Sequence, residues 1–102
     1  MDSEYRRVHR VANIHYAKGT AAVTDQELLN VFTRTLRDLI GDHSIVLAMN
    51  TRRSDVERWD SFMYVNFIVA IELELRIKFS VADVESFETV GDIAAEARSL
   101  LG

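Results

Sequence analysis

Ser61 is the residue whose type and position most clearly suggest chemistry. It lies in the tetrapeptide Trp59-Asp60-Ser61-Phe62, immediately before a long apolar run over residues 65–75. A hydroxyl at the point where a loop becomes a helix is exposed, held by a rigid element and close to the positive end of the helix dipole. Unpaired backbone N–H groups and the dipole both favour an anion there. The sequence therefore predicts that Ser61 is an attachment point for a phosphate ester.

Ser61 has a simpler alternative role as an N-cap, in which its hydroxyl only satisfies backbone N–H groups of the helix. Asp60 also has two interpretations, because it can support the helix start or contribute to partner recognition. The residues alone leave both alternatives open.

The chain offers few other reactive groups. It contains no cysteine, which excludes disulfides, thiolate zinc sites and a cysteine nucleophile. His9, His15 and His43 are too scattered to form a metal site, and solvated histidines are expected instead. No serine–histidine–acid or paired-carboxylate arrangement follows from the spacing. The sequence therefore predicts no metal site and no catalytic centre.

The elements that position Ser61 belong to one domain, because 102 residues are enough for one core. Hydrophobic residues make up 48% of the chain, which predicts a packed globule. Proline is absent and glycine occurs four times, a composition that favours helices over turn-rich sheets. Glu72, Glu74 and Arg76 interrupt the most apolar run, and the first residues lack the apolar core of a signal peptide. We therefore expect a cytoplasmic protein that does not enter a membrane.

The net charge of −4 is unevenly distributed. Residues 1–23 carry four basic and two acidic side chains, whereas residues 24–102 carry eight basic and fourteen acidic ones. We expect the basic leader, residues 1–23, to be a frayed arm or a short helix, and residues 24–102 to form the domain. The acidic body argues against nucleic acid as a partner, and a nucleic-acid arm is the weaker alternative for the leader.

The first predicted helix covers residues 25–40, with a capping box of Thr24 and Glu27 at its start and Gly41 as its stop. Its apolar face has helical spacing and consists of Leu28, Phe32, Leu36 and Leu39. A long connection follows over residues 41–60, and loops of this length usually have a function or an anchor of their own. The apolar patch expected to pin this connection to the bundle is Ile45, Val46, Leu47 and Met49.

The segment that begins with the serine fits two patterns. Apolar residues alternate with charged residues over 71–79, which is typical of a half-buried strand. The same segment also lines a helix face with apolar residues, and Glu72 and Arg76 have the i, i+4 order that supports a helix. Its length decides in favour of a helix over residues 61–75, followed by an extended exit over residues 77–79.

The end of the chain predicts two further helices. A short helix fits residues 81–86, and Thr89 provides an N-cap three residues before Asp92 for a last helix over residues 90–101. The apolar face of the last helix consists of Val90, Ile93, Ala94, Ala97, Leu100 and Leu101. The expected architecture is an all-α bundle of three main helices and one short helix, with a long first loop.

This arrangement resembles the acyl carrier protein family over about residues 24–101. The shared features are an Asp-Ser pair at the start of the middle helix, the body and exit of that helix, and a Thr-Val-Gly-Asp start of the last helix. The matching residues are Asp60, Ser61, Phe62, Val65, Ala70, Ile71, Glu72, Glu74 and Leu75, then residues 77–79 and 89–93. The Asp-Ser pair alone is a weak motif, whereas the whole set at matching spacing is a strong one.

The resemblance implies a carrier rather than an enzyme. Ser61 would receive a 4'-phosphopantetheine arm from a separate phosphopantetheinyl transferase, and the thiol of the arm would hold an acyl group as a thioester. Asp60 would position contacts of the transferase or cap the helix. The other implied partners are an acyl- or aminoacyl-loading ligase and downstream acyl-transfer enzymes. A monomeric carrier would deliver its cargo to them at high effective concentration.

The chain departs from the family at the face where partners dock. Carriers of fatty acid synthesis usually have acidic residues just after the serine, and here these places hold Met63, Tyr64 and Asn66. We infer a specialised carrier that serves a dedicated pathway of fatty acid or secondary metabolite biosynthesis. An aminoacyl or peptidyl carrier is an alternative within the class, and an unmodified helical interaction module is an alternative from another class.

Five residues are expected to contact partners, namely Trp59, Phe62, Met63, Tyr64 and Glu72. Trp59 has the alternatives of shielding the base of the arm or packing the loop onto the bundle, and Phe67 is expected in the core. Arg52 and Arg53 are expected in a solvated loop, with a contact to the phosphate of the arm as a secondary role. The residues expected to line an apolar interior that shelters an acyl chain are Val65, Val69, Ile71 and Leu75.

Overall fold

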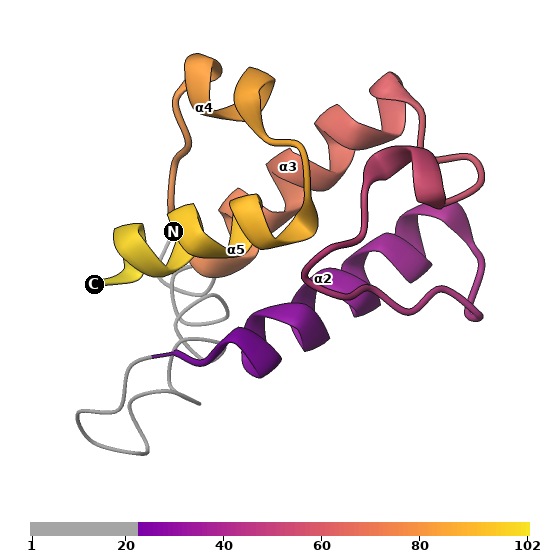
Figure 1. The fold of residues 1–102 in the computed structure, drawn as a ribbon, viewed down its shortest axis with the longest axis horizontal. Coiled ribbons are helices and arrows are strands. Elements are labelled where there is room, and N and C mark those ends of the chain that lie inside the picture. Colours follow the sequence, from indigo (N-terminus) through magenta and orange to yellow (C-terminus); the bar gives the residue numbers. More distant parts are fainter. Residues whose placement is uncertain (1–22) are drawn as a thin grey trace, which may run out of the picture.

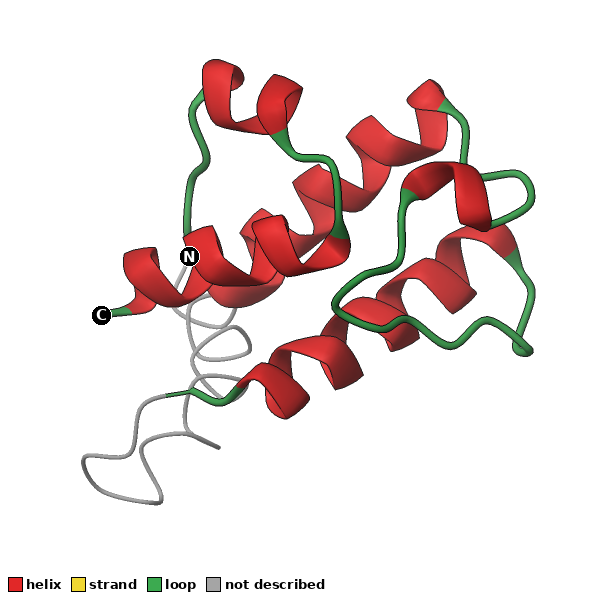
Figure 2. Cartoon of the chain, viewed as in Figure 1, coloured by secondary structure: helices red, strands yellow, loops and turns green. Residues whose placement is uncertain are grey.

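The computed structural model describes residues 23–102, and within that range the chain forms four helices, a short 3-10 turn and no strand (Figures 1 and 2). The predicted all-α architecture is confirmed, with three main helices, one short helix and a long first loop. The predicted leader falls outside the described residues except for Val23, which is buried. None of the helices in the described part is long and apolar enough to cross a membrane.

Helix α2 (Asp25–Ile40) begins where the capping box predicts. The hydroxyl of Thr24 accepts a hydrogen bond from the backbone N–H of Glu27 at 3.1 Å, and the carboxylate of Glu27 accepts one from the N–H of Thr24 at 2.8 Å. Gly41 ends the helix in the left-handed conformation, with φ 80°, which a residue without a Cβ adopts readily. Both ends of α2 are therefore fixed by local interactions.

Helix α3 (Ser61–Leu75) shows that the ambiguous segment is helical. Strand-like alternation would place Leu73 on the same side as Ile71 and Leu75. Leu73 is 67% exposed, however, while Ile71 and Leu75 are buried. The helix ends at Leu75, and the C-cap residue Arg76 adopts the left-handed conformation with φ 59°.

Val65 and Val69 of α3, which were predicted to line an apolar interior that shelters an acyl chain, are 55% and 46% exposed and lie outside the packed core. Both line the open cleft described below, whereas Ile71 and Leu75 of the same predicted set are buried in the core and do not line the cleft. Helix α3 carries apolar residues around its whole circumference, so the pattern contains little information about which side faces the core. The buried side of α3 consists of Phe67, Ile68, Ile71 and Leu75. The burial of Phe67, Ile71 and Leu75 agrees with the prediction.

Helices α4 (Val81–Ser86) and α5 (Val90–Leu101) have the predicted bounds. The hydroxyl of Ser80 caps α4 by accepting a hydrogen bond from the backbone N–H of Asp83 at 3.0 Å. Thr89 caps α5 in the predicted capping box. No residue of α4 is buried, so this helix depends on a few specific contacts for its position.

The connection between α2 and α3 is anchored by part of the predicted patch. Ile45 and Leu47 are buried, and the N–H of Leu47 donates a hydrogen bond to the hydroxyl of Thr33 at 3.2 Å. Val46, which was expected in the same patch, is 74% exposed. Further along, the connection contains the 3-10 turn η1 (Arg53–Asp55).

The connection also packs tightly against the start of α5. The N–H of Gly91 donates a hydrogen bond to the carbonyl oxygen of Met49 at 2.7 Å, and the N–H of Val90 donates one to the carbonyl oxygen of Thr51 at 2.9 Å. A Cβ on Gly91 would lie only 2.8 Å from that Met49 oxygen. The close approach of the two backbones therefore requires glycine at this position.

The core lies where α2, α3 and α5 meet. Figure 1 shows α2 and α3 running side by side, with α4 on the side of the bundle away from α2. The rings of Phe32 and Phe67 meet edge to face across this interface, with 5.8 Å between their centroids. The largest fully buried side chains are those of Phe32, Phe67, Leu28, Leu36, Ile71 and Val90.

Candidate functional site

Ser61 is the first residue of α3, and its hydroxyl is not needed to cap that helix. The cap is Asp60, whose Oδ1 accepts a hydrogen bond from the backbone N–H of Met63 at 2.9 Å. Ser61 is exposed, and no hydrogen bond within residues 23–102 uses its hydroxyl. The capping role therefore belongs to Asp60, and Ser61 keeps an accessible hydroxyl at the positive end of the helix dipole.

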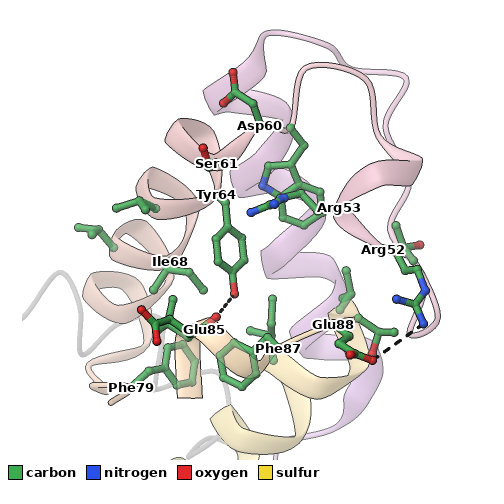
Figure 3. Close-up of a pocket in the computed structure, with 18 of the residues that line it drawn as sticks. Arg52, Arg53, Asp60, Ser61, Tyr64, Ile68, Phe79, Glu85, Phe87 and Glu88 are labelled. Atoms are coloured by element: carbon green, nitrogen blue, oxygen red, sulfur yellow. Dashed lines mark hydrogen bonds and ion pairs between the residues drawn. The ribbon is translucent and has the colours of Figure 1, made fainter. Parts of the chain in front are cut away.

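Ser61 lies at the edge of an open cleft of about 1040 Å³. The cleft is bounded by the last part of the long connection, by α3, by α4 and by the start of α5 (Figure 3). Its apolar lining includes Ile68, Val69, Phe79, Val84, Phe87 and Ile93. Figure 3 shows Asp60, Ser61 and Arg53 toward one end of the cleft and Phe79 and Phe87 toward the other. The serine thus lies at one end of the cleft, and the other end combines these two rings with the exposed acids Glu85 and Glu88.

Tyr64 spans the cleft from α3 to α4. Its hydroxyl donates a hydrogen bond to the backbone carbonyl oxygen of Val84 at 2.6 Å (Figure 3). The guanidinium of Arg53 lies over the ring, 5.0 Å from the centroid, in a cation–π contact. Partial burial raises the pKa of the Tyr64 hydroxyl, and the charge of Arg53 opposes this shift. The hydroxyl is therefore a protonated donor at neutral pH.

A second contact that positions α4 is formed by two aromatic residues, one before and one after the helix. The rings of Phe79 and Phe87 meet edge to face with 5.3 Å between their centroids. Phe79 is buried and Phe87 is half-buried, and both line the cleft. Together with the bond from Tyr64, this pair holds a helix that buries no residue of its own.

Glu72 is turned inward rather than toward a partner, which corrects its predicted role. Its Oε2 accepts a hydrogen bond from the backbone N–H of Phe79 at 2.8 Å. Its Oε1 lies 3.8 Å from the Nζ of Lys78, and only 11% of the Glu72 side chain is exposed. The carboxylate therefore fixes the exit of α3 beside Phe79, at the end of the cleft away from Ser61.

The other predicted partner contacts have different environments. Phe62 is 71% exposed, whereas Met63 and Tyr64 are only half-buried and pack against the core. Trp59 is 4% exposed and meets Phe67 edge to face, with 5.1 Å between centroids. The loop-packing interpretation of Trp59 is thus confirmed, and its ring offers almost no surface as a docking anchor.

The exposed side of α3 carries an apolar stripe, which we define as Phe62, Val65, Val69 and Leu73. Val65 and Val69 also line the cleft, whereas Phe62 and Leu73 lie outside it. Steps of three and four residues place these side chains on one face of the helix. The acids of α3 are bonded within the fold, since Glu74 pairs with Arg34 at 2.6 Å and Glu72 is turned inward. This face therefore offers apolar side chains rather than available carboxylates.

Several cleft residues were not predicted as site residues. Val84 and Phe87 reach the cleft only because α4 folds back on α3, and the bond from Tyr64 to Val84 joins residues 20 positions apart. Arg53 was expected in a solvated loop with a secondary role, and its contact with Tyr64 has no local sequence signal. For Phe79 the sequence offered one signal, because this residue is the last apolar position of the alternating pattern over residues 71–79.

A scan against protein-family models, a search of curated proteins and a search of solved structures each returned no match for this chain. The features of the chain that bear on its function are therefore Ser61, the cleft beside it and the apolar stripe.

Proposed function

We propose that this chain is an acyl carrier, which holds an acyl group as a thioester on a 4'-phosphopantetheine arm attached to Ser61 and delivers it to partner enzymes. The observation that carries the proposal is the position of the Ser61 hydroxyl. It is exposed at the first residue of α3, it is released from capping by Asp60, and it lies at the edge of an apolar cleft. The resemblance to acyl carrier proteins over residues 24–101 gives the same assignment.

The surroundings of Ser61 fit a phosphodiester. The first-turn N–H groups of a 15-residue helix favour negative charge, and Asp60 occupies one of them while leaving the serine oxygen exposed. The Ser61 oxygen would form the new bond to phosphorus, the phosphoanhydride bond of the donor would break with a nucleotide phosphate as the leaving group, and the serine proton would pass to a base of the transferase. Arg53, a cation that lines the same cleft, would favour the phosphate by charge.

The cleft supports an acyl group as the cargo. When attached, the arm supplies a thiol that forms the thioester. The chain's own contribution would be shelter, because Ile68, Val69 and Phe79 and their neighbours offer an apolar surface that starts near Ser61. The volume of about 1040 Å³ matches the upper range of small-molecule sites, which are mostly apolar with a few polar groups.

The test is the intact mass of the full chain after co-expression with a broad-specificity phosphopantetheinyl transferase. We expect a gain of one arm, mapped to the peptide that contains Ser61. Ser61→Ala should remain unmodified with an unchanged circular dichroism spectrum. Ser99→Ala, at an exposed serine of α5, is the matched control and should be modified like the wild type. An unchanged wild-type mass beside a modified reference carrier would refute the proposal.

The apolar stripe favours one second candidate, an unmodified helical interaction module. Contiguous exposed apolar side chains on a small protein usually mark a binding surface, and Phe62 and Leu73 are 71% and 67% exposed. The module would bind a partner through the stripe and stay unmodified beside an active transferase. The mass measurement thus separates the two candidates.

The nature of the cargo separates acyl from aminoacyl or peptidyl carriers. The apolar lining of the cleft favours an acyl chain over a charged amino acid. Incubation of the modified chain with candidate acyl and aminoacyl ligases, followed by mass spectrometry, tests this choice. Loading by aminoacyl ligases alone would assign the chain to the other carrier class.

A further inference from the structure

The indole N–H of Trp59 is a buried donor without an acceptor. Trp59 is 4% exposed, and its Nε1 is the one buried side-chain nitrogen or oxygen within residues 23–102 that has no hydrogen-bond partner. The indole nitrogen can only donate, so the missing partner must be an acceptor. Buried polar groups in folded proteins are nearly always paired, and an exception calls for a specific explanation.

Trp59 contributes to the wall of the cleft, two residues before Ser61. Two rings pack against it: Phe67 with 5.1 Å and Tyr64 with 6.4 Å between centroids. Phe67 is fully buried in the core, whereas Tyr64 is half-buried and lines the cleft. Tyr64 is therefore the neighbour that can move without opening the core.

The position of Tyr64 depends on its bond to the carbonyl oxygen of Val84, on a helix that buries no residue. A rotation of Tyr64 would exchange this bond for one with water and would move its ring away from the indole, from which its centroid is 6.4 Å distant. The closed arrangement leaves the Trp59 donor unsatisfied. An acceptor that enters the cleft therefore gains a hydrogen bond that the closed arrangement lacks, and this difference shifts the equilibrium toward the open one.

We propose that, when Tyr64 leaves Val84, the Trp59 N–H donates a hydrogen bond to a carbonyl oxygen of the group tethered at Ser61. This inference rests on the proposed carrier function. A neutral acceptor fits because the cleft is mostly apolar, where an anion costs far more to desolvate. An anion would instead remain near Arg53 and solvent. The carbonyl belongs either to the amides of the arm or to the acyl cargo, and the experiment distinguishes these sources.

The chain contains one tryptophan, so its indole N–H gives a single side-chain signal in a ¹H–¹⁵N correlation spectrum. Spectra are recorded for the unmodified chain and for three forms whose mass confirms one arm on Ser61: the free thiol, the octanoyl thioester and the 5-oxooctanoyl thioester. We expect the indole proton to move downfield and to exchange more slowly in at least one modified form. A response already in the free-thiol form assigns the acceptor to the arm. A response that first appears with octanoyl assigns it to the thioester, and one that requires 5-oxooctanoyl assigns it to the chain.

Two variants sharpen the experiment. Tyr64→Phe removes the bond to Val84 but keeps a ring, so the indole response should become larger. Ser61→Ala, mixed with the same transferase and acyl donors, reveals any effect of ligand that is not tethered and should show no response. Each substitution removes one hydroxyl, from the half-buried Tyr64 or the exposed Ser61, so we expect both variants to fold. The wild-type spectra test the inference even without the variants.

The inference is overturned if the indole signal keeps the position and exchange rate of the unmodified chain in all three forms. A shift without slower exchange also overturns it, because ring currents alone can move a signal. A chain that gains no mass fails at the proposed function and removes the basis of the inference. A chain that gains the arm without an indole response fails only here, so the two failures are distinguishable.

Discussion

The hydroxyl of Tyr64 and the carbonyl oxygen of Val84, 2.6 Å apart, form the hydrogen bond that joins α3 to α4 across the cleft. Helix α4 has no buried residue, so this bond contributes more to its attachment than a similar bond would in a core helix. The opposite wall of the cleft belongs to α3, which is fixed in the core by Phe67 and Ile71. The width of the cleft therefore depends mainly on α4 and on this bond.

Replacing Tyr64 with Phe is expected to loosen α4 while the aromatic ring is kept. The substitution removes one hydrogen bond and should lower the free energy of unfolding by about 0.5–1.5 kcal/mol. Amide hydrogen exchange should accelerate in α4 more than in α2, because α4 has few other contacts. Urea unfolding and exchange mass spectrometry measure both effects, with α2 as the internal reference. Equal exchange of α4 in both proteins would contradict the role of the bond.

Gly91→Ala is expected to lower the free energy of unfolding by about 1–3 kcal/mol through overpacking. The new Cβ would lie 2.8 Å from the Met49 carbonyl oxygen, which is the acceptor of the Gly91 N–H at 2.7 Å. Gly41 provides the matched comparison, because nothing lies within 4 Å of its Cβ position and only its left-handed backbone resists a side chain. Asparagine tolerates the left-handed conformation, so Gly41→Asn should change the free energy of unfolding little, whereas Gly91→Asn should lower it. Urea unfolding measures both values. Equal losses at both positions would refute the packing argument.

The helix ends could be predicted because each depends on a few neighbouring residues. Thr24 with Glu27, and Thr89 with Asp92, form hydrogen bonds across three positions, so the capping boxes are visible in the sequence itself. Gly41 is likewise a local signal, because glycine itself can adopt the left-handed conformation that ends α2. The middle helix could not be assigned from its pattern, because the segment also alternates like a strand. Its length decided in favour of a helix.

The cleft could not be predicted in detail because it depends on contacts between distant segments. Helix α3 is apolar on all sides, and therefore spacing could not show that Val65 and Val69 are exposed and line the cleft instead of the core. Trp59 is buried because the long connection folds back onto Phe67, which no local signal indicates. The position and exposure of Ser61 were predictable, since they depend only on the helix start and an adjacent cap.

The carboxylate of Asp92 should link stability to pH. The backbone N–H groups of Glu88 and Thr89 donate to it at 2.8 and 3.1 Å and hold its pKa below the ordinary value. A carboxyl whose pKa is lower in the folded state stabilises the fold above its unfolded pKa of about 3.9, and this contribution is lost as pH falls through the folded value. Asp92→Asn should therefore lower Tm at neutral pH and lower it progressively less below about pH 4. Thermal unfolding of both proteins from neutral to acidic pH checks this, and a constant difference in Tm would contradict it.

Arg53→Gln is expected to slow the modification of Ser61 if the proposed function holds. The substitution removes a positive charge that lines the cleft with the serine. Exposed charge pairs contribute about 0.2–1 kcal/mol, which corresponds to at most about a fivefold change in rate. The effect should shrink as salt is added, since salt screens exposed charges. Arg58→Gln is the matched control, because Arg58 is exposed on the same connection but does not line the cleft. Equal time courses of mass gain for the two variants would count against a role for Arg53.

Phe62→Ser should separate docking from folding. Phe62 is 71% exposed and does not line the cleft, so the free energy of unfolding should change by less than about 0.5 kcal/mol. Its ring belongs to the apolar stripe and adjoins Ser61. If the proposed function holds, the transferase should therefore need a higher concentration of the variant to reach half its maximal rate. This loss should persist at high salt, because apolar contacts are not screened, in contrast to the effect of Arg53→Gln. Leu100→Ser, at a 43% exposed leucine outside the stripe, is the matched control. A half-saturating concentration equal to that of the control would show that the stripe does not contribute to docking of the transferase.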